Sequence, residues 1–241
     1  YSEERLMATI YLIRHGQASF GAEDYDKLSE LGRRQAAVVG EYLRDSGVHF
    51  DAVYSGDLSR QRETAKLAIA SQSEAVPLHI DPRFNEIQND AQLKCLMPEV
   101  VKINPTIQAL VDKGLSSSKD YQKVIDAVFN YWVSPACADP RIQSWAEFSG
   151  DARQAIADVI QEQGGGKTVG IFTSGGTLAT IVAQVLGLGG EKTYQFYEPV
   201  LNCSVTQLFY SGSRISLSYF NDCSFFRVLG GQRGENLLTY R

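Results

Sequence analysis

Arg14, His15 and Gly16 are the first residues in this chain whose types and order could do chemistry. They follow an apolar, β-rich run at 8–13, which predicts a buried strand that delivers polar side chains into a loop at its C-terminal end. Ligand sites in open α/β sheets lie at that end. An imidazole beside a guanidinium suits attack on a phosphoryl group whose oxygens the arginine holds bidentately. The plain alternative is a strand that merely ends in polar residues.

Arg60 and Glu86 are two further side chains that suit phosphoryl chemistry. A strand at 50–54 breaks into a helix with Asp57 as its expected N-cap, so Arg60 falls on the first turn and points back toward the strand ends. Glu86 is set between apolar neighbours, where a raised proton affinity could make it a general acid. The alternatives are a solvated helix arginine and a surface loop glutamate.

A glycine turn supplies a third candidate region. Ser174, Gly175 and Gly176 follow an apolar strand at 168–173 and open an apolar helix that runs to Leu186. Free backbone N–H groups and the positive end of a helix dipole together form a natural seat for an anion. Glycines alone could equally mark a tight turn.

Strand and helix patterns alternate along the chain and predict how these residues are positioned. The predicted strands are 8–13, 50–54, 76–80, 168–173, 205–210 and 214–220. Apolar positions spaced near 3.6 predict a helix that begins after Ser29 and ends near Ser46. The last two strands, joined by a glycine turn, predict a hairpin that finishes the sheet.

The middle of the chain is helical in period. From 91 to 163 we expect helices near 121–132 and 147–163, with Pro98 and Pro105 among the residues that mark breaks. The whole pattern predicts an α/β three-layer sandwich with a mostly parallel central sheet and helices on both faces. A helical insertion at about 91–150 is expected to cap the site.

Bulk composition limits the classes of partner. The chain has 241 residues, of which 44% are hydrophobic and 21% charged, and a net charge of −5. That charge gives no overall basic field for nucleic acid or a membrane surface, so phosphate-binding cations must be local.

No apolar run approaches the roughly 18 residues of a membrane span, and no signal-peptide pattern begins the chain, so we expect a cytoplasmic protein. Four dispersed cysteines argue against structural zinc.

The domain expectation is a single unit. Residues 1–6 precede Met7 and are expected to be a cloning remnant outside the fold. Residues 7–241 show no internal repeat and no low-complexity linker, which favours one α/β domain with a helical insertion.

Motifs spread over most of the chain jointly resemble one family. They are Leu12-Ile13-Arg14-His15-Gly16-Gln17, Leu28-Ser29 with Gly32 and Gln35-Ala36, Tyr54-Ser55, and Leu58-Ser59-Arg60 with Glu63-Thr64-Ala65. In order and spacing the chain resembles the histidine phosphatase superfamily, in its phosphoglycerate mutase-like branch.

The resemblance implies a role for each matched residue. His15 would be the nucleophile that becomes phosphohistidine, Arg14 and Arg60 would hold the phosphate, and Glu86 would donate a proton to the leaving oxygen. Residues expected to bind substrate are Gln17, Ser174, Gly175, Gly176 and Asn202. The implied partner is phosphate or a small phosphorylated molecule, and the resemblance implies neither metal nor cofactor. Oligomeric state is left open.

Ser174 is the main departure from the family pattern. The family has a second pocket histidine at this point, which donates to the phosphoryl oxygens. A serine hydroxyl is shorter and neutral, so the charge-assisted contact is lost. By analogy with removing one donor from an oxyanion site, we expect a loss on the order of 10²–10³ in rate. A weakened natural enzyme, a natural pseudoenzyme and a deliberately altered chain all fit this substitution.

The function expected from these residues is hydrolysis of a small phosphomonoester through phosphohistidine, weakened by Ser174. One alternative is an impaired pseudoenzyme that uses the same pocket to bind phosphate or a phosphorylated partner. The other is a phosphomutase, which transfers the group to a second hydroxyl. Hydrolysis is favoured because the segment 87–90 after Glu86 does not resemble the longer substrate-gripping segment of glycolytic mutases.

Overall fold

One six-stranded sheet organises the computed structural model, which describes residues 7–19, 26–115 and 117–240. The expected remnant at 1–6 lies outside these residues. The strands are β1 (Ala8–Arg14), β2 (Ala52–Ser55), β3 (Leu78–Ile80), β4 (Thr168–Thr173), β5 (Val205–Ser211) and β6 (Arg214–Asp222). Their order is β3-β2-β4-β1-β5-β6, with parallel pairing from β3 to β1 and antiparallel pairing from β1 to β6. The predicted mostly parallel sheet and terminal hairpin are confirmed.

Alternating side chains along β1 divide the core into two layers. Ile10 and Leu12 are buried in the cluster on one face, whereas Tyr11 and Ile13 are buried in the cluster on the other. A strand buried on both faces is near-continuously apolar, which accounts for the run at 8–13. β1 is therefore a central strand, and the loop that begins at His15 emerges at the middle of the sheet.

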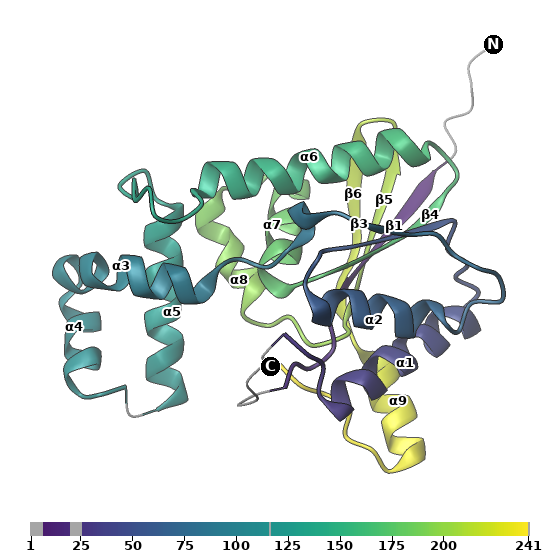
Figure 1. Cartoon of the computed structure of the whole chain (residues 1–241), viewed down its shortest axis with the longest axis horizontal. Helices are drawn as coiled ribbons and strands as arrows, with labels where there is room; N and C mark the ends of the chain where they lie inside the picture. Colours follow the sequence, from purple (N-terminus) through teal and green to yellow (C-terminus); the bar gives the residue numbers. More distant parts are fainter. Residues whose placement is uncertain (1–6, 20–25, 116, 241) are drawn as a thin grey trace.

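Helices cover both faces of the sheet, as predicted (Figure 1). The helices α1 (Glu30–Asp45), α2 (Ser59–Ile69) and α9 (Ser224–Arg233) pack on one face. On the opposite face lie α6 (Trp145–Gln163) and α7 (Gly175–Val185). The expected N-cap Ser29 accepts a hydrogen bond from the Gly32 N–H. The helix predicted near 147–163 thus belongs to the sheet layers as α6.

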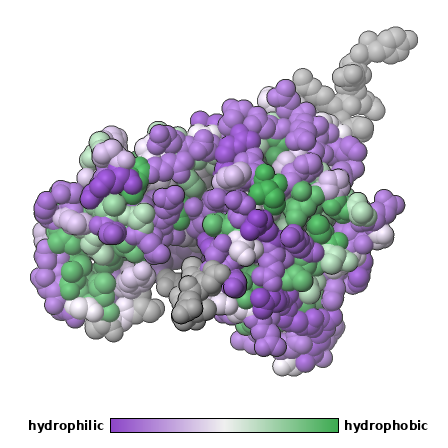
Figure 2. All heavy atoms as spheres, in the orientation of Figure 1, coloured by the Kyte–Doolittle hydropathy of each residue, from purple (hydrophilic) through white to green (hydrophobic). Residues whose placement is uncertain are grey.

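A helical lobe stands beside the sheet. It is built from α3 (Asn89–Ile103), α4 (Pro105–Asp112) and α5 (Ser118–Val133), and the short α8 (Thr193–Tyr197) packs against it. This lobe has its own apolar cluster, in which Leu96, Phe129 and Trp132 are buried. In Figure 1 it lies at the left, beside the sheet, and in Figure 2 hydrophobic side chains appear among hydrophilic ones over it. Two single 3-10 turns, Pro82–Phe84 and Gly190–Lys192, complete the elements.

Two local predictions are wrong. Asp57 is not the N-cap of α2: the cap is Leu58, and the Ser59 N–H donates instead to Asp26, a residue distant in sequence. Pro98 lies inside α3 rather than at a break, whereas Pro105 does begin α4. None of the helices in the described ranges has the length and apolar character that crossing a membrane requires.

Candidate active site

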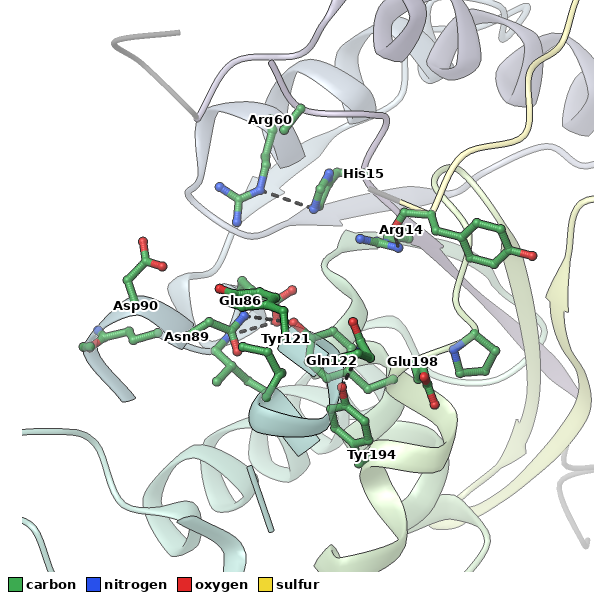
Figure 3. A pocket seen from close by; sticks show the side chains of 18 of the residues that line it. Arg14, His15, Arg60, Glu86, Asn89, Asp90, Tyr121, Gln122, Tyr194 and Glu198 are labelled. Atoms are coloured by element: carbon green, nitrogen blue, oxygen red, sulfur yellow. Dashed lines mark hydrogen bonds between the residues drawn. The ribbon is translucent and has the colours of Figure 1, made fainter. Parts of the chain in front are cut away.

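Arg14, His15, Arg60 and Glu86 line one cavity of about 1080 Å³ at the carboxyl end of β1. In Figure 3, Arg60 and His15 face each other from different elements, and Glu86 lies across the opening from them. Arg14 ends β1, Arg60 lies on the first turn of α2, and Glu86 follows the 3-10 turn after β3. Residues distant in sequence therefore meet where parallel strands end, as the rule for open sheets predicts.

His15 is held as a neutral imidazole with one nitrogen facing the cavity. Its Nδ1 lies 2.7 Å from the Gly16 carbonyl oxygen, and its Nε2 lies 3.2 Å from Arg60 Nε. A carbonyl only accepts and a guanidinium only donates, so the proton is assigned to Nδ1 and the lone pair to Nε2. Burial, followed by the positive charges of Arg14 and Arg60, lowers the pKa of His15 well below its ordinary value. The neutral form of the ring is therefore favoured near pH 7.

Arg14 is anchored by two backbone carbonyl groups distant from it in sequence. Its Nη1 donates to the Val200 carbonyl and, over 2.9 Å, to the Tyr240 carbonyl. Tyr240 also lines the cavity. The extreme C-terminal segment, which carried no recognisable motif, therefore helps to fix an arginine of the site.

Arg60 is held by Asp26. Its Nη1 lies 2.8 Å from Asp26 Oδ1, and the other oxygen of that carboxylate accepts from the Ser59 N–H over 2.7 Å. Asp26 therefore caps α2 and orients the arginine on its first turn. Nearby, Thr64 accepts from the Gly16 N–H over 3.0 Å, which ties α2 to the loop after His15.

Glu86 has the surroundings of a general acid. Burial raises its pKa above the ordinary value, against the lowering effects of the Ile87 N–H, the two arginines and the Gly176 N–H. Both N–H groups donate to the same oxygen, Oε1, over 2.9 and 3.1 Å. The proton of the neutral acid therefore belongs on Oε2. This arrangement favours a protonated carboxyl at a pH where an exposed glutamate is ionised.

Ser174 lies beside His15 in the sheet but does not line the cavity. The parallel register pairs Arg14 with Thr173, and the His15 N–H donates to the Thr173 carbonyl, so the next residue of each strand is adjacent. Ser174 is 0% exposed, and its hydroxyl accepts from Gln61 Nε2 over 2.8 Å. Gln61 is equally buried and also donates to the Phe84 carbonyl. The two side chains form a buried, hydrogen-bonded pair that is not part of the cavity wall.

The glycine turn packs tightly between site residues. A Cβ on Gly175 would lie 3.0 Å from the Tyr197 ring and 3.5 Å from Arg14 Nε. A Cβ on Gly176 would come within 2.5 Å of Glu86 Oε1. Both positions therefore need glycine for close approach. The Gly176 N–H is directed at Glu86, so the start of α7 positions the carboxyl group.

Asn202 and Gln17, both expected to bind substrate, lie behind the cavity wall. Asn202 is 1% exposed, and its Nδ2 donates to the His15 carbonyl over 3.1 Å. Its Oδ1 accepts from Thr239. The Gln17 side chain accepts from Ser29 at the start of α1. Neither is among the described residues that line the cavity; both brace the backbone around His15.

The far side of the cavity comes from the helical lobe, which the sequence predicts as an insertion that caps the site, and from α8, whose part in the site was not predicted; nor were the individual lining residues there. The lining residues there include Asn89, Asp90, Lys119, Tyr121, Gln122, Ile125, Tyr194, Tyr197 and Glu198. These residues form no sequence motif, because a pocket wall requires side chains of suitable size and polarity and no fixed spacing. The sequence did indicate a helix that begins near Tyr121. His49 and His79 do not line the cavity.

The arrangement brings together groups that suit acid-assisted phosphoryl transfer: an imidazole whose pKa is lowered, two guanidinium groups and a carboxyl group whose pKa is raised. Within the described ranges, no cluster of three or more His, Cys, Asp or Glu side chains could hold a metal ion.

Solved structures with the same fold include a phosphoglycerate mutase from Bacillus anthracis, with a TM-score of 0.64 and 24% identity. The alignment covers 94% of this chain and 97% of that one. An Entamoeba histolytica phosphoserine phosphatase mutant in complex with phosphoserine aligns with a TM-score of 0.62 and 19% identity, over 90% and 98% of the two chains.

Similar sequences include phosphatases and mutases. A broad-specificity phosphatase of Saccharomyces cerevisiae is 34% identical over 83 residues, which is 32% of this chain and 36% of that protein. The matches to the first three relatives span 36%, 38% and 35% of their lengths. A probable phosphoglycerate mutase of Erwinia tasmaniensis is 25% identical over 84% of this chain and 85% of its own length.

A family model covers most of the chain. The model for the histidine phosphatase superfamily (branch 1) matches residues 10–105 and 107–223. These ranges contain Arg14, His15, Arg60 and Glu86, and they end before Tyr240. This chain belongs to the histidine phosphatase superfamily.

Proposed function

We propose that this protein is a phosphomonoesterase that acts through a phosphohistidine formed on His15. The observation that carries the proposal is the contact between His15 Nε2 and Arg60 Nε, 3.2 Å apart, at the mouth of a cavity that Arg14 and Glu86 also line. A lone pair held beside guanidinium donors is arranged for attack on an electron-poor, anionic centre. A phosphoryl group is such a centre.

In the first step, His15 Nε2 forms a bond to phosphorus as the bond to the leaving oxygen breaks. The phosphoryl oxygens attract the donors of Arg14 and Arg60, which draws Arg60 away from the imidazole lone pair. Glu86 gives its proton to the departing alcohol and becomes a carboxylate. The proton stays on Nδ1 and is donated to the Gly16 carbonyl oxygen, 2.7 Å away, and this hydrogen bond stabilises the positive charge that the ring acquires.

In the second step, water attacks the phosphohistidine. The Glu86 carboxylate takes a proton from that water, the phosphorus–nitrogen bond breaks, and His15 returns to its neutral state as phosphate leaves. Residue 174 is a serine whose hydroxyl accepts a hydrogen bond from Gln61, so no imidazole is present there to stabilise the charge of the transition state. We therefore expect both steps to be slower than in a site with two histidines.

Binding without turnover is the second candidate, and the burial of Ser174 favours it. Two arginines suffice to bind an anion, since binding needs no proton transfer. Transfer to a second hydroxyl, the reaction named for some relatives, is a third reading. With phosphoglycerate it needs the carboxylate to be held as well, and among the described residues that line the cavity beyond the phosphate end, Lys119 is the single cation.

Phosphate release and phosphate binding, measured on the same preparations, test the proposal. We expect slow release of phosphate from 4-nitrophenyl phosphate and propyl phosphate by the unaltered chain. His15→Ala should abolish release while calorimetry still detects inorganic phosphate binding, because both arginines remain. Phosphate binding without release from any ester, in the unaltered chain, would instead establish the binding module.

A further inference from the structure

The cavity is much larger than its phosphate end requires. Its volume of about 1080 Å³ lies at the upper end of the ~300–1,000 Å³ typical of sites for drug-sized ligands. Arg14, His15, Arg60 and Glu86 occupy one end, and most of the remaining lining comes from α3, α5 and α8. A phosphate ester of two or three carbons would leave most of this space to water.

The charges beyond the phosphate end do not suit a second anion. Among the described residues that line this part, those with a formal charge near pH 7 are Lys119, Asp90 and Glu198, all of them exposed. Their formal charges sum to one negative unit, so they give no excess positive potential. A carboxylate or second phosphate is usually held by a bidentate arginine, and both arginines of the lining lie at the phosphate end.

The wall of the large part is aromatic and aliphatic. Tyr194 and Tyr197 pack edge to face, 5.9 Å apart, and their hydroxyls accept from Gln122 and Asn89. Each ring is thus fixed by a side-chain amide. On α5, Tyr121 is 38% exposed and lines the cavity (Figure 3). The half-buried Ile125 lines it as well. Such a wall gains most free energy by covering an apolar ring.

Resting on the proposed function, we propose that the substrate is the phosphate ester of an uncharged alcohol that carries a ring-sized apolar group. The phosphoryl group lies at His15, and the ring lies against Tyr121 and Ile125 on α5 and Tyr194 on α8. Tyr121 and Ile125 are then specificity residues, because they touch the leaving group and not the phosphate. Esters of anionic alcohols, such as 3-phosphoglycerate, are poor substrates.

Three primary-alcohol esters test this proposal: 2-phenylethyl phosphate, propyl phosphate and 3-phosphoglycerate. The first should exceed propyl phosphate in kcat/KM by at least about tenfold, since even one methylene in an apolar pocket is worth ~10–200-fold. Tyr121→Ala and Ile125→Ala should each reduce that ratio by about threefold or more while kcat/KM for propyl phosphate changes little. Lys123→Ala, on an exposed part of α5 outside this cavity, is the matched control and should leave the ratio unchanged.

Binding of the phosphonates 2-phenylethylphosphonate and propylphosphonate, measured by calorimetry, gives the same ratio without turnover. If no ester is hydrolysed but the phosphonate ratio holds and depends on Tyr121, the proposed function fails while the ring site stands. Equal values for the phenylethyl and propyl compounds, a ratio that Tyr121→Ala leaves unchanged, or preference for 3-phosphoglycerate would overturn the proposal.

Discussion

At the scale of single residues, the site depends on two proton positions. The contacts of His15 place its proton on Nδ1, away from the cavity. Burial raises the pKa of Glu86, which favours the protonated form that its proposed role toward the leaving group requires. The nucleophile must be deprotonated at Nε2 and the acid must be protonated, so the two residues set opposite limits on the active pH range.

The pH dependence of kcat/KM follows from these two directions. The pKa of His15 is lowered, so activity should rise through an acidic pH range and reach its plateau below the usual histidine range. The pKa of Glu86 is raised, so activity toward alkyl phosphates should fall as pH increases through a value above that of an ordinary glutamate. We expect a bell with an acidic optimum in initial-rate measurements. An optimum on the alkaline side would contradict these assignments.

Glu86→Gln should show a leaving-group dependence. Propyl phosphate needs protonation of a basic oxygen, so its kcat should fall by about 10²–10⁴-fold. 4-Nitrophenyl phosphate has a stable leaving anion, so the rate constant of its first step should fall by less than about tenfold. Stopped-flow measurement of nitrophenol release isolates that step. Equal losses for the two esters would remove Glu86 from the role of acid.

Ser174 and Gln61 should behave as one unit. Both are 0% exposed and share a hydrogen bond of 2.8 Å, so an imidazole at 174 would be overpacked against the Gln61 amide at a cost of about 1–3 kcal/mol. Ser174→His alone should therefore raise kcat by less than about tenfold. With Gln61→Ala added, the gain should approach ~10²–10³-fold.

Gln61→Ala alone is the control for this pair and should not raise kcat. The three variants and the unaltered chain form a double-mutant cycle in kcat, with thermal unfolding as the measure of folding. A full gain from Ser174→His alone would show that the buried pair does not block the position.

At the scale of elements, the first turn of α2 connects the parts of the site. Arg60 contacts His15, and the adjacent Gln61 contacts Ser174 and the Phe84 carbonyl. Consecutive residues of one helix thus reach two strand ends and the turn that carries Glu86. Asp26 fixes this helix from a loop more than thirty positions earlier, through Ser59 and Arg60.

Asp26→Ala should therefore have two effects. Loss of the cap should lower the free energy of unfolding by about 1 kcal/mol. Loss of the 2.8 Å ion pair should let the Arg60 side chain move and reduce kcat by roughly tenfold. Asp57→Ala is the matched control, since the Asp57 side chain forms an exposed pair with Arg62 at 3.3 Å, worth ~0–1 kcal/mol. Chemical denaturation and initial rates distinguish the two; equal effects would contradict the role given to Asp26.

This contrast also shows what the sequence could predict. The strand that ends at Arg14 and the helix turn that carries Arg60 have strong local patterns, so their elements were predictable, and the resemblance joined them to Glu86. Asp26 as the cap of α2, the Gln61–Ser174 pair and the Tyr240 carbonyl on Arg14 are contacts between distant residues. Such contacts depend on tertiary packing, which cannot be predicted from the spacing of apolar residues within one helix or strand. Asp57 was predicted as the cap because it stands next to the helix.

At the scale of the whole molecule, the sheet and the helical lobe have separate apolar clusters. The sheet clusters support β1 and α2, whereas the lobe cluster supports the wall of the large part of the cavity. Phosphate binding therefore depends on one part of the molecule and the fit of the leaving group on another (Figure 1).

Phe129→Ala should reveal this division. Phe129 is 2% exposed and its ring lies 5.5 Å from Tyr194 and 5.8 Å from Trp132. The free energy of unfolding should fall by about 3–5 kcal/mol, while the affinity for inorganic phosphate in the folded protein should change little. Ile103→Ala, at a 65% exposed position, is the control and should stay within about 0.5 kcal/mol. Loss of phosphate affinity in folded Phe129→Ala would contradict the division.

Mass spectrometry of the unaltered chain after incubation with 4-nitrophenyl phosphate tests the central claim most directly. The account predicts an acid-labile phosphoryl adduct on the peptide that contains His15 and no such adduct in His15→Ala. The adduct should be long-lived, because Ser174 is hydrogen-bonded to Gln61 and supplies no imidazole for its hydrolysis. Phosphate release with no such adduct under rapid quenching, or an adduct on a different residue, would contradict it.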